Sequence, residues 1–181
     1  MNNFIILLLV VTCLSFTEHK QSEEKIIWGQ REIQWDDFKG VPPKDHNSFT
    51  GAITSTIIST EYGGFPGSIP TTKVQCYFIK NKSWTLLKDS YSLAHERLHF
   101  DISEVFARKI RKAFDSLRVN EITELAEYEQ IVEIYDKKQK AFNREYDTQV
   151  YSNKEKQELW SEKIKSELKA LGEYKCLPSD E

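Results

Sequence analysis

The sequence predicts an α+β fold in which a twisted, mostly antiparallel sheet is followed by three helices. Residues 26–85 combine β-branched and aromatic residues with turn-forming segments, which is typical of short strands. Residues 86–173 repeat apolar residues every three or four positions, which is typical of amphipathic helices. The chain has 181 residues, of which 39% are hydrophobic and 29% charged, so it can bury one core. We therefore expect a single domain over residues 18–181.

The strand-rich half consists of short pieces separated by turns. Residues 26–28 and 33–35 are apolar and aromatic, and residues 50–60 are rich in threonine and isoleucine, which suit a pleated surface. Residues 73–80 alternate, which places their apolar side chains on one face of a strand. Residues 63–70 have the glycine and proline content of a loop. We expect that loop to be a plain hairpin connection rather than the border of a cleft.

Three helices are expected in the second half. Asp89 or Ser90 is a suitable N-cap for the first, which we expect to stop before a break at residues 119–120. Gly172 lies where the last of the three helices is expected to end. The three predicted helices span residues 90–117, 121–146 and 153–171.

The first residues have the character of an export signal. Residues 4–11 form an unbroken apolar run that is too short to span a bilayer as a helix. We expect a signal peptide over residues 1–17 and an exported protein, periplasmic or secreted. A second interpretation is a lipoprotein signal in which Cys13 is lipidated, which would anchor the protein to the outer membrane. Membrane association is expected only in that second case.

Export would leave Cys76 and Cys176 as the cysteines of the mature chain. In an oxidising compartment two cysteines can pair. The alternative is two buried thiols, and the sequence leaves both open. Neither cysteine lies in a motif for metal binding or nucleophilic catalysis.

The charge balance gives no indication of a nucleic-acid partner. The chain has 25 basic and 28 acidic residues, a net charge of −3. Four basic residues gather at positions 108–112, near the end of the first predicted helix, where they complement the helix dipole. We expect no nucleic-acid partner, and the sequence does not fix the oligomeric state.

The most informative motif is His95-Glu96-Arg97-Leu98-His99. Residues four apart lie on the same face of a helix, so the two imidazoles can grip one zinc ion. The glutamate between them can act on a water at the metal, which is the apparatus of metal-assisted hydrolysis. The motif predicts one zinc ion per chain.

The phase of the helix predicts that these histidines point inward. With about 100° per residue, His99 lies near 40° from His95, close to Ile102 near 340° and Phe106 near 20°. The histidines thus continue an apolar stripe, where an unpaired imidazole would be costly. The alternative is a buried histidine pair satisfied by ordinary hydrogen bonds.

A catalytic zinc site needs a third protein ligand. Asp101 and Glu104 fall near 240° and 180° from His95 on the same helix, so we expect both to face away. His19 lies at the signal boundary and His46 in a polar loop, which makes both poor candidates. Asp147 is the best candidate, because the second predicted helix could fold back antiparallel across the first.

Two tyrosines flank this candidate ligand. Tyr146 and Tyr151 lie close enough in sequence to Asp147 for a hydroxyl to stabilise an oxyanion. The alternative interpretation makes Asp147 a helix-end or capping residue and the tyrosines packing residues.

Several segments together resemble a known family. Residues 93–102 are similar to the core motif of an uncharacterised bacterial family of predicted secreted zinc-dependent proteases, which reads His-Glu-Gln-Gly-His-Phe-Asp-Ile. Residues 35–40 resemble its Trp-x-Asp-Phe-x-Gly signature, Tyr146-Asp147 its Tyr-Asp pattern, and Trp160 a tryptophan that follows. The chain departs from the family at Arg97-Leu98, which should not touch the metal. It also departs downstream, where Val150, Ser152 and Asn153 replace a threonine and a His-Gly pair.

The resemblance implies a zincin-like fold, zinc binding with Asp147 as third ligand, and peptidase activity. We therefore expect an exported zinc metallopeptidase in which His95 and His99 complete the ligand set and Glu96 is the general base. Its partner would be a peptide or protein substrate. The alternatives are a non-catalytic envelope protein that binds zinc or a metal-free module that binds peptides. The sequence does not distinguish a protease from an amidase that acts on cell-wall peptides.

Overall fold

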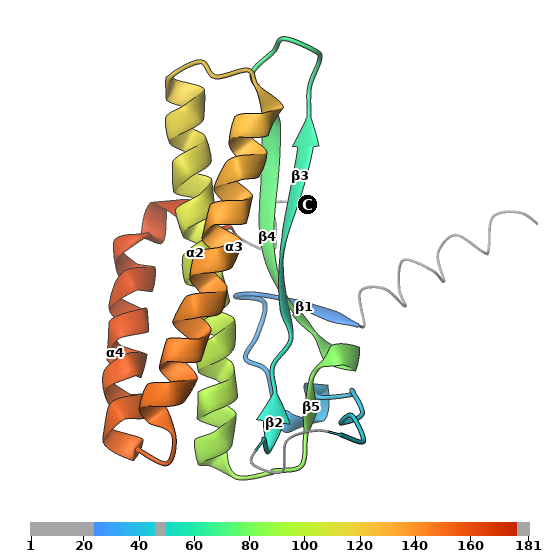
Figure 1. Ribbon diagram of the computed structural model, residues 1–181, viewed down its shortest axis with the longest axis vertical. Helices are drawn as coiled ribbons and strands as arrows, with labels where there is room; N and C mark the ends of the chain where they lie inside the picture. Colours follow the sequence, from blue (N-terminus) through green and yellow to red (C-terminus); the bar gives the residue numbers. More distant parts are fainter. Residues whose placement is uncertain (1–23, 46–49, 177–181) are drawn as a thin grey trace, which may run out of the picture.

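The structure is a computed structural model and describes residues 24–45 and 50–176. Within them, short strands are followed by long helices, so the predicted α+β class is confirmed (Figure 1). The strands are β1 (Lys25–Ile27), β2 (Ala52–Ile53), β3 (Thr56–Gly63), β4 (Thr71–Ile79) and β5 (Trp84–Thr85). The helices are α2 (Ser90–Val119), α3 (Leu125–Val150) and α4 (Lys154–Ala170), with 3₁₀ turns η1 (Trp35–Asp37), η2 (Lys80–Lys82) and η3 (Gly172–Tyr174).

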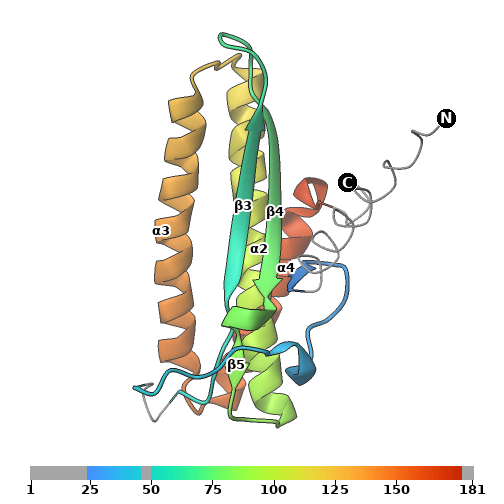
Figure 2. The same cartoon turned by 90° about the vertical axis from the view of Figure 1, so that its right-hand side faces the viewer.

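The strands pair antiparallel in two small sheets. One has the order β1-β4-β3, and β2 pairs with β5 in the other. The β3–β4 ladder runs from the pair Thr56–Phe78 to the pair Gly63–Thr71, and residues 64–70 close it as the expected hairpin connection (Figure 2). Within the described residues β3 is hydrogen-bonded to β4 alone, so the stretch from β2 to β3 lies along an edge.

One predicted strand is wrong. Residues 33–35 join no sheet, and η1 begins at Trp35. The carboxylate of Asp37 accepts a hydrogen bond from the backbone N–H of Gln34 at 2.9 Å and from the guanidinium of Arg31 at 2.7 Å. These local bonds satisfy the backbone in a turn, as short polar side chains commonly do.

The helices follow the predicted order with shifted ends. Asp89 caps α2 by accepting a hydrogen bond from the N–H of Ser92 at 2.8 Å, as its position in the sequence predicts. The second helix begins at Leu125 rather than residue 121, because Glu121 adopts a left-handed φ of 54° that ends the preceding turn. That helix also ends four residues later than predicted, at Val150, whose side chain is buried.

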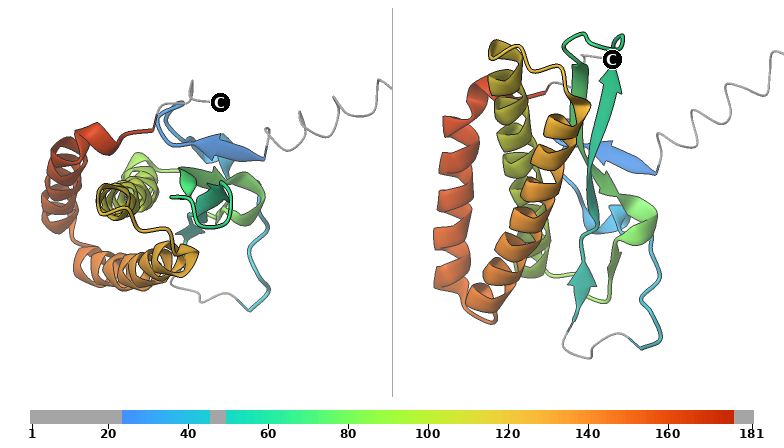
Figure 3. Two further views of the ribbon diagram at one scale, coloured as in Figure 1. Left: turned by 90° about the horizontal axis from the view of Figure 1, so that it is seen from above. Right: turned by 45° about the horizontal axis from the view of Figure 1, so that its top comes forward.

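Helix α2 is the centre of the molecule. It packs against α3 and α4 on one side and against β3 and β4 on the other, as the view from above shows (Figure 3). Two apolar clusters result, one toward the sheet and one among the helices. The sheet-side cluster includes Phe78, Phe100, Phe114 and Tyr128. The helix-side cluster includes Ile102, Phe106, Tyr146, Trp160 and Ile164.

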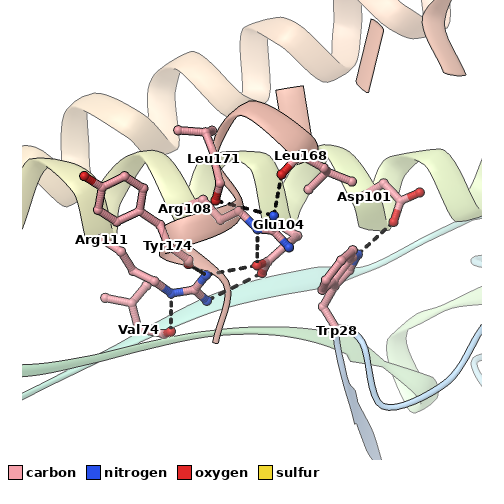
Figure 4. Close-up of polar contacts among 9 residues, drawn as sticks. All are labelled: Trp28, Val74, Asp101, Glu104, Arg108, Arg111, Leu168, Leu171 and Tyr174. Atoms are coloured by element: carbon pink, nitrogen blue, oxygen red, sulfur yellow. Dashed lines mark hydrogen bonds and ion pairs between the residues drawn. The ribbon is translucent and has the colours of Figure 1, made fainter. Parts of the chain in front are cut away.

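A buried ion cluster ties α2 to the end of the described chain (Figure 4). Glu104 accepts hydrogen bonds from Arg108 at 2.8 Å and from Arg111 at 2.9 Å. The two arginines also donate to backbone carbonyls, those of Val74, Leu168 and Tyr174. Every charge in this cluster has a partner, and the cluster joins β4, α2, α4 and η3.

The two cysteines of the described residues, Cys76 and Cys176, are not joined by a disulfide. Cys76 lies in the buried face of β4, and burial raises the pKa of its thiol. Cys176 is only partly buried, so the alternative of two buried thiols holds for Cys76 and not for Cys176.

Several expectations fall on residues outside the described ranges. These are the signal peptide over residues 1–17, the lipidation of Cys13, and the histidines His19 and His46. Among the described residues, no helix is long and apolar enough to cross a membrane.

Candidate metal centre

Three predicted ligands converge on one point. His95 and His99 lie one turn apart on α2, with 3.1 Å between their Nε2 atoms. The Oδ1 atom of Asp147 on α3 lies 2.9 Å from Nε2 of His99 and 3.3 Å from Nε2 of His95. Ligand atoms about 2.0–2.1 Å from a tetrahedral zinc are about 3.3 Å apart. The observed spacings are close to that value, so these residues could hold one metal ion.

Asp147 reaches the histidines because α3 lies antiparallel along α2. The helix continues through Val150, so Asp147 lies in its last turn and projects toward the α2 histidines. Burial favours the neutral imidazole of His99, but the hydrogen bond and charge of Asp147 outweigh burial and raise its pKa. Burial likewise opposes ionisation of Asp147, and hydrogen bonds from His95 and His99 outweigh it and lower the pKa of that carboxyl.

Asn143 is a residue of the site that sequence reasoning missed. Its Oδ1 atom lies 2.8 Å from Nδ1 of His99, and its Nδ2 donates to the backbone carbonyl of Gln139 at 3.1 Å. Because the amide nitrogen is used by that carbonyl, the oxygen faces His99 and accepts the hydrogen of Nδ1. With its proton on Nδ1, the neutral imidazole could present the lone pair of Nε2 to a metal ion. In the sequence, its place in the site is indicated by position, since Asn143 precedes Asp147 by one helical turn.

Tyr146 supports the histidines from the protein interior. Its ring stacks on His95 with 4.7 Å between centroids and meets the edge of His99 at 5.0 Å. Its hydroxyl donates to the backbone carbonyl of His95 at 3.4 Å, and burial raises its pKa. Tyr151 is 67% exposed and lines the cleft beside the site. An oxyanion role stays a prediction for both tyrosines.

Glu96 is buried and has an unused acceptor. Its side chain is 5% exposed, and its Oε2 atom has no hydrogen-bond partner among the described residues. A buried carboxylate oxygen without a hydrogen-bond partner is costly, so such atoms gather where a ligand or a reaction uses them. Glu96 lines the same cleft as the three ligands.

The cleft has a volume of about 700 Å³. One wall is residues 50–56, which include β2, the opposite wall comes from α3, and α2 with its histidines lies between them. The metal centre therefore opens to a space that a peptide segment could enter.

The acidic residues excluded by helix phase do face away. Asp101 accepts a hydrogen bond from the indole N–H of Trp28 at 2.7 Å (Figure 4). Glu104 belongs to the arginine cluster on the far side of α2. Arg97 donates to the carbonyl of Ile33 at 2.8 Å, so it also points away from the ligands, as expected.

Comparison of the chain with protein-family models, with curated proteins and with solved structures finds no match. The resemblance to predicted secreted zinc-dependent proteases therefore stays a prediction.

Proposed function

We propose that the protein is an exported zinc-dependent metallopeptidase. One observation carries the proposal: a histidine–histidine–carboxylate triad and a buried glutamate with one oxygen that has no hydrogen-bond partner line one cleft. Two imidazoles and one carboxylate are a donor set of catalytic zinc sites, which keep one position open for water or substrate. The donor set and the distances between its atoms both fit zinc.

The zinc ion would be held by His95, His99 and Asp147. When bound, zinc supplies a Lewis acid that polarises a carbonyl and lowers the pKa of water. The hydrogen bond from His99 to Asn143 and the ring of Tyr146 keep the imidazoles oriented, so little freedom is lost when the metal binds.

Glu96 is proposed as the general base and then the general acid. Its carboxylate lines the cleft and can accept a proton from the attacking water and deliver it to the leaving amine nitrogen. The Oε2 atom of this carboxylate is buried, and the protein around it excludes bulk water, which strengthens the electrostatic part of the transfer. Tyr151, exposed in the cleft, is the better placed tyrosine to meet a developing oxyanion.

The edge formed by residues 50–56 suits an extended peptide. A peptide laid along such an edge makes main-chain hydrogen bonds that are tolerant of sequence. The zinc ligands line the same cleft as this edge, so the scissile bond of a peptide bound along the edge would lie near them.

The test is the Glu96→Gln variant. We expect it to keep one zinc per chain and to lose about 10²- to 10⁴-fold in peptide hydrolysis, because the amide cannot take the proton. Zinc is measured by elemental analysis, and hydrolysis with a library of quenched fluorescent peptides. Glu133→Gln, an exposed change on α3, is the matched control. Undiminished hydrolysis by Glu96→Gln would overturn the proposed role.

A further inference from the structure

The cleft carries an uneven charge. Among the described residues that line it, four bear formal charges, and two of these, Glu96 and Asp147, belong to the metal centre. The other two are Lys140 and Arg144, both basic and both on α3. The opposite wall, residues 50–56, contains no charged residue. The chain as a whole has a net charge of −3, so this cleft differs from the average surface.

Both basic residues lie on one side of the metal centre. With a rise of about 1.5 Å per residue, Arg144 lies about 4.5 Å and Lys140 about 10.5 Å from Asp147 along the α3 axis. They are displaced toward the end where Gln139 bonds Ser103, which in turn contacts Thr56. The other end of the cleft is lined by large, partly exposed apolar and aromatic side chains, those of Leu87, Tyr91 and Tyr151.

Arg144 is the stronger of the two candidates. The Lys140 ammonium is already 2.7 Å from the carboxylate of Asp136. Within the described ranges, the Arg144 guanidinium makes no hydrogen bond or ion pair, although it lines the cleft. A guanidinium presents paired donors that match a carboxylate in two parallel hydrogen bonds. An unpaired arginine beside a reactive centre is therefore suited to bind an acidic substrate group.

We propose that the cleft selects peptides with an acidic side chain near the scissile bond, bound by Arg144 and reinforced by Lys140. An extended peptide rises about 3.3 Å per residue, so for a peptide that runs parallel to the α3 axis Arg144 would lie one to two residues from the scissile bond and Lys140 about three. The basic pair also raises the local concentration of acidic peptides by electrostatic attraction. This inference rests on the proposed function, since it names the substrate class of the same site.

The experiment measures binding without cleavage. The zinc-loaded Glu96→Gln protein is titrated into dye-labelled peptides that share one leucine and carry either two glutamates or two glutamines beside it. Both chain orders are made, so the direction of the bound peptide is not assumed. We expect the glutamate peptide of one order to bind about tenfold more tightly at low salt, and the advantage to shrink as salt is added. Arg144→Glu, added to Glu96→Gln, should reverse the preference toward a matched lysine peptide.

Lys137→Glu is the matched control, because it makes a similar charge reversal on the same helix. Its side chain is 78% exposed and does not line the cleft. Equal affinity for glutamate and glutamine peptides, no peptide binding at all, or an equal loss in Lys137→Glu would overturn the inference. A wild-type protein that binds acidic peptides selectively without cleaving them would contradict the proposed function alone. A wild-type protein that cleaves without preference would contradict only the inference.

Discussion

Helix α2 carries two buried glutamates with opposite surroundings. Glu104 is 1% exposed, and Arg108 and Arg111 donate to its carboxylate within the core (Figure 4). Glu96 is 5% exposed, and its Oε2 atom has no partner among the described residues. The first site is electrostatically closed and joins elements of the fold. The second is open toward a cleft, so its burial makes sense as preparation for a ligand or a reaction.

Asp101 lies between these two extremes. It is partly buried, and its carboxylate accepts one hydrogen bond from the indole of Trp28. The three acids of α2 thus differ in their surroundings. Glu104 has two cationic partners, Asp101 has one neutral partner, and Glu96 has one oxygen without a partner. The number and charge of the partners, rather than burial alone, distinguish the three acids.

The largest expected difference is in stability. Glu104→Gln should lower the free energy of unfolding by about 3–5 kcal/mol, because it leaves two buried arginines without a counter-charge. Glu96→Gln should change it by less than about 1 kcal/mol, because no ion pair is broken. Urea unfolding of both variants and the wild type measures the difference. Equal losses in the two variants would remove the distinction between a closed and an open site.

The next largest effect is expected at Asn143. Replacing it with leucine should weaken zinc binding by about 10- to 100-fold, because His99 loses the acceptor that orients its ring. Asn143→Asp keeps an oxygen acceptor and should keep most of the affinity. Competition with a chelator of known affinity measures both. Equal weakening in the two variants would show that Asn143 matters for packing and not for orienting His99.

The smallest effect concerns Asp101 and pH. Burial raises the pKa of its carboxyl, against the opposing hydrogen bond from Trp28. The folded state binds the proton of Asp101 at a higher pH than the unfolded state does. The contribution of this carboxyl to the free energy of unfolding therefore falls as pH rises through its folded-state pKa. Asp101→Asn keeps an oxygen acceptor for the indole and should be more stable than wild type at pH 7 by about 0.5–1 kcal/mol.

Unfolding curves at pH 4 and pH 7 measure this linkage. The advantage of Asp101→Asn should be smaller at pH 4, where the wild-type carboxyl is closer to neutral. An advantage that is the same at both pH values would contradict the assignment of the shift to Asp101.

Helix periodicity predicted the α2 side of the site from sequence. It placed His95 and His99 in line with Ile102 and Phe106, both of which are buried. It also placed Asp101 and Glu104 on other faces, where the structure finds them. Periodicity works here because α2 is one uninterrupted helix, so local phase alone fixes which residues share a face.

The α3 side depended on tertiary packing. Asp147 was an attractive candidate by motif, but only the antiparallel packing of α3 on α2 brings it to the histidines. Asn143 carries no motif, and its role follows from lying one turn before Asp147. The sequence also misled at residues 33–35, where an apolar pattern favoured a strand. The local hydrogen bonds of Asp37 outweighed that pattern.

We propose that His95, His99 and Asp147 bind a catalytic metal, and the metal content of the purified protein is the first property to measure. The purified protein, His95→Ala and Asp147→Ala are compared by elemental analysis after dialysis against trace zinc, with Glu96→Gln as the control for folding. We expect one zinc per chain in the wild type and in Glu96→Gln, and loss of zinc in both ligand variants. A folded wild-type protein that retains no zinc would contradict it.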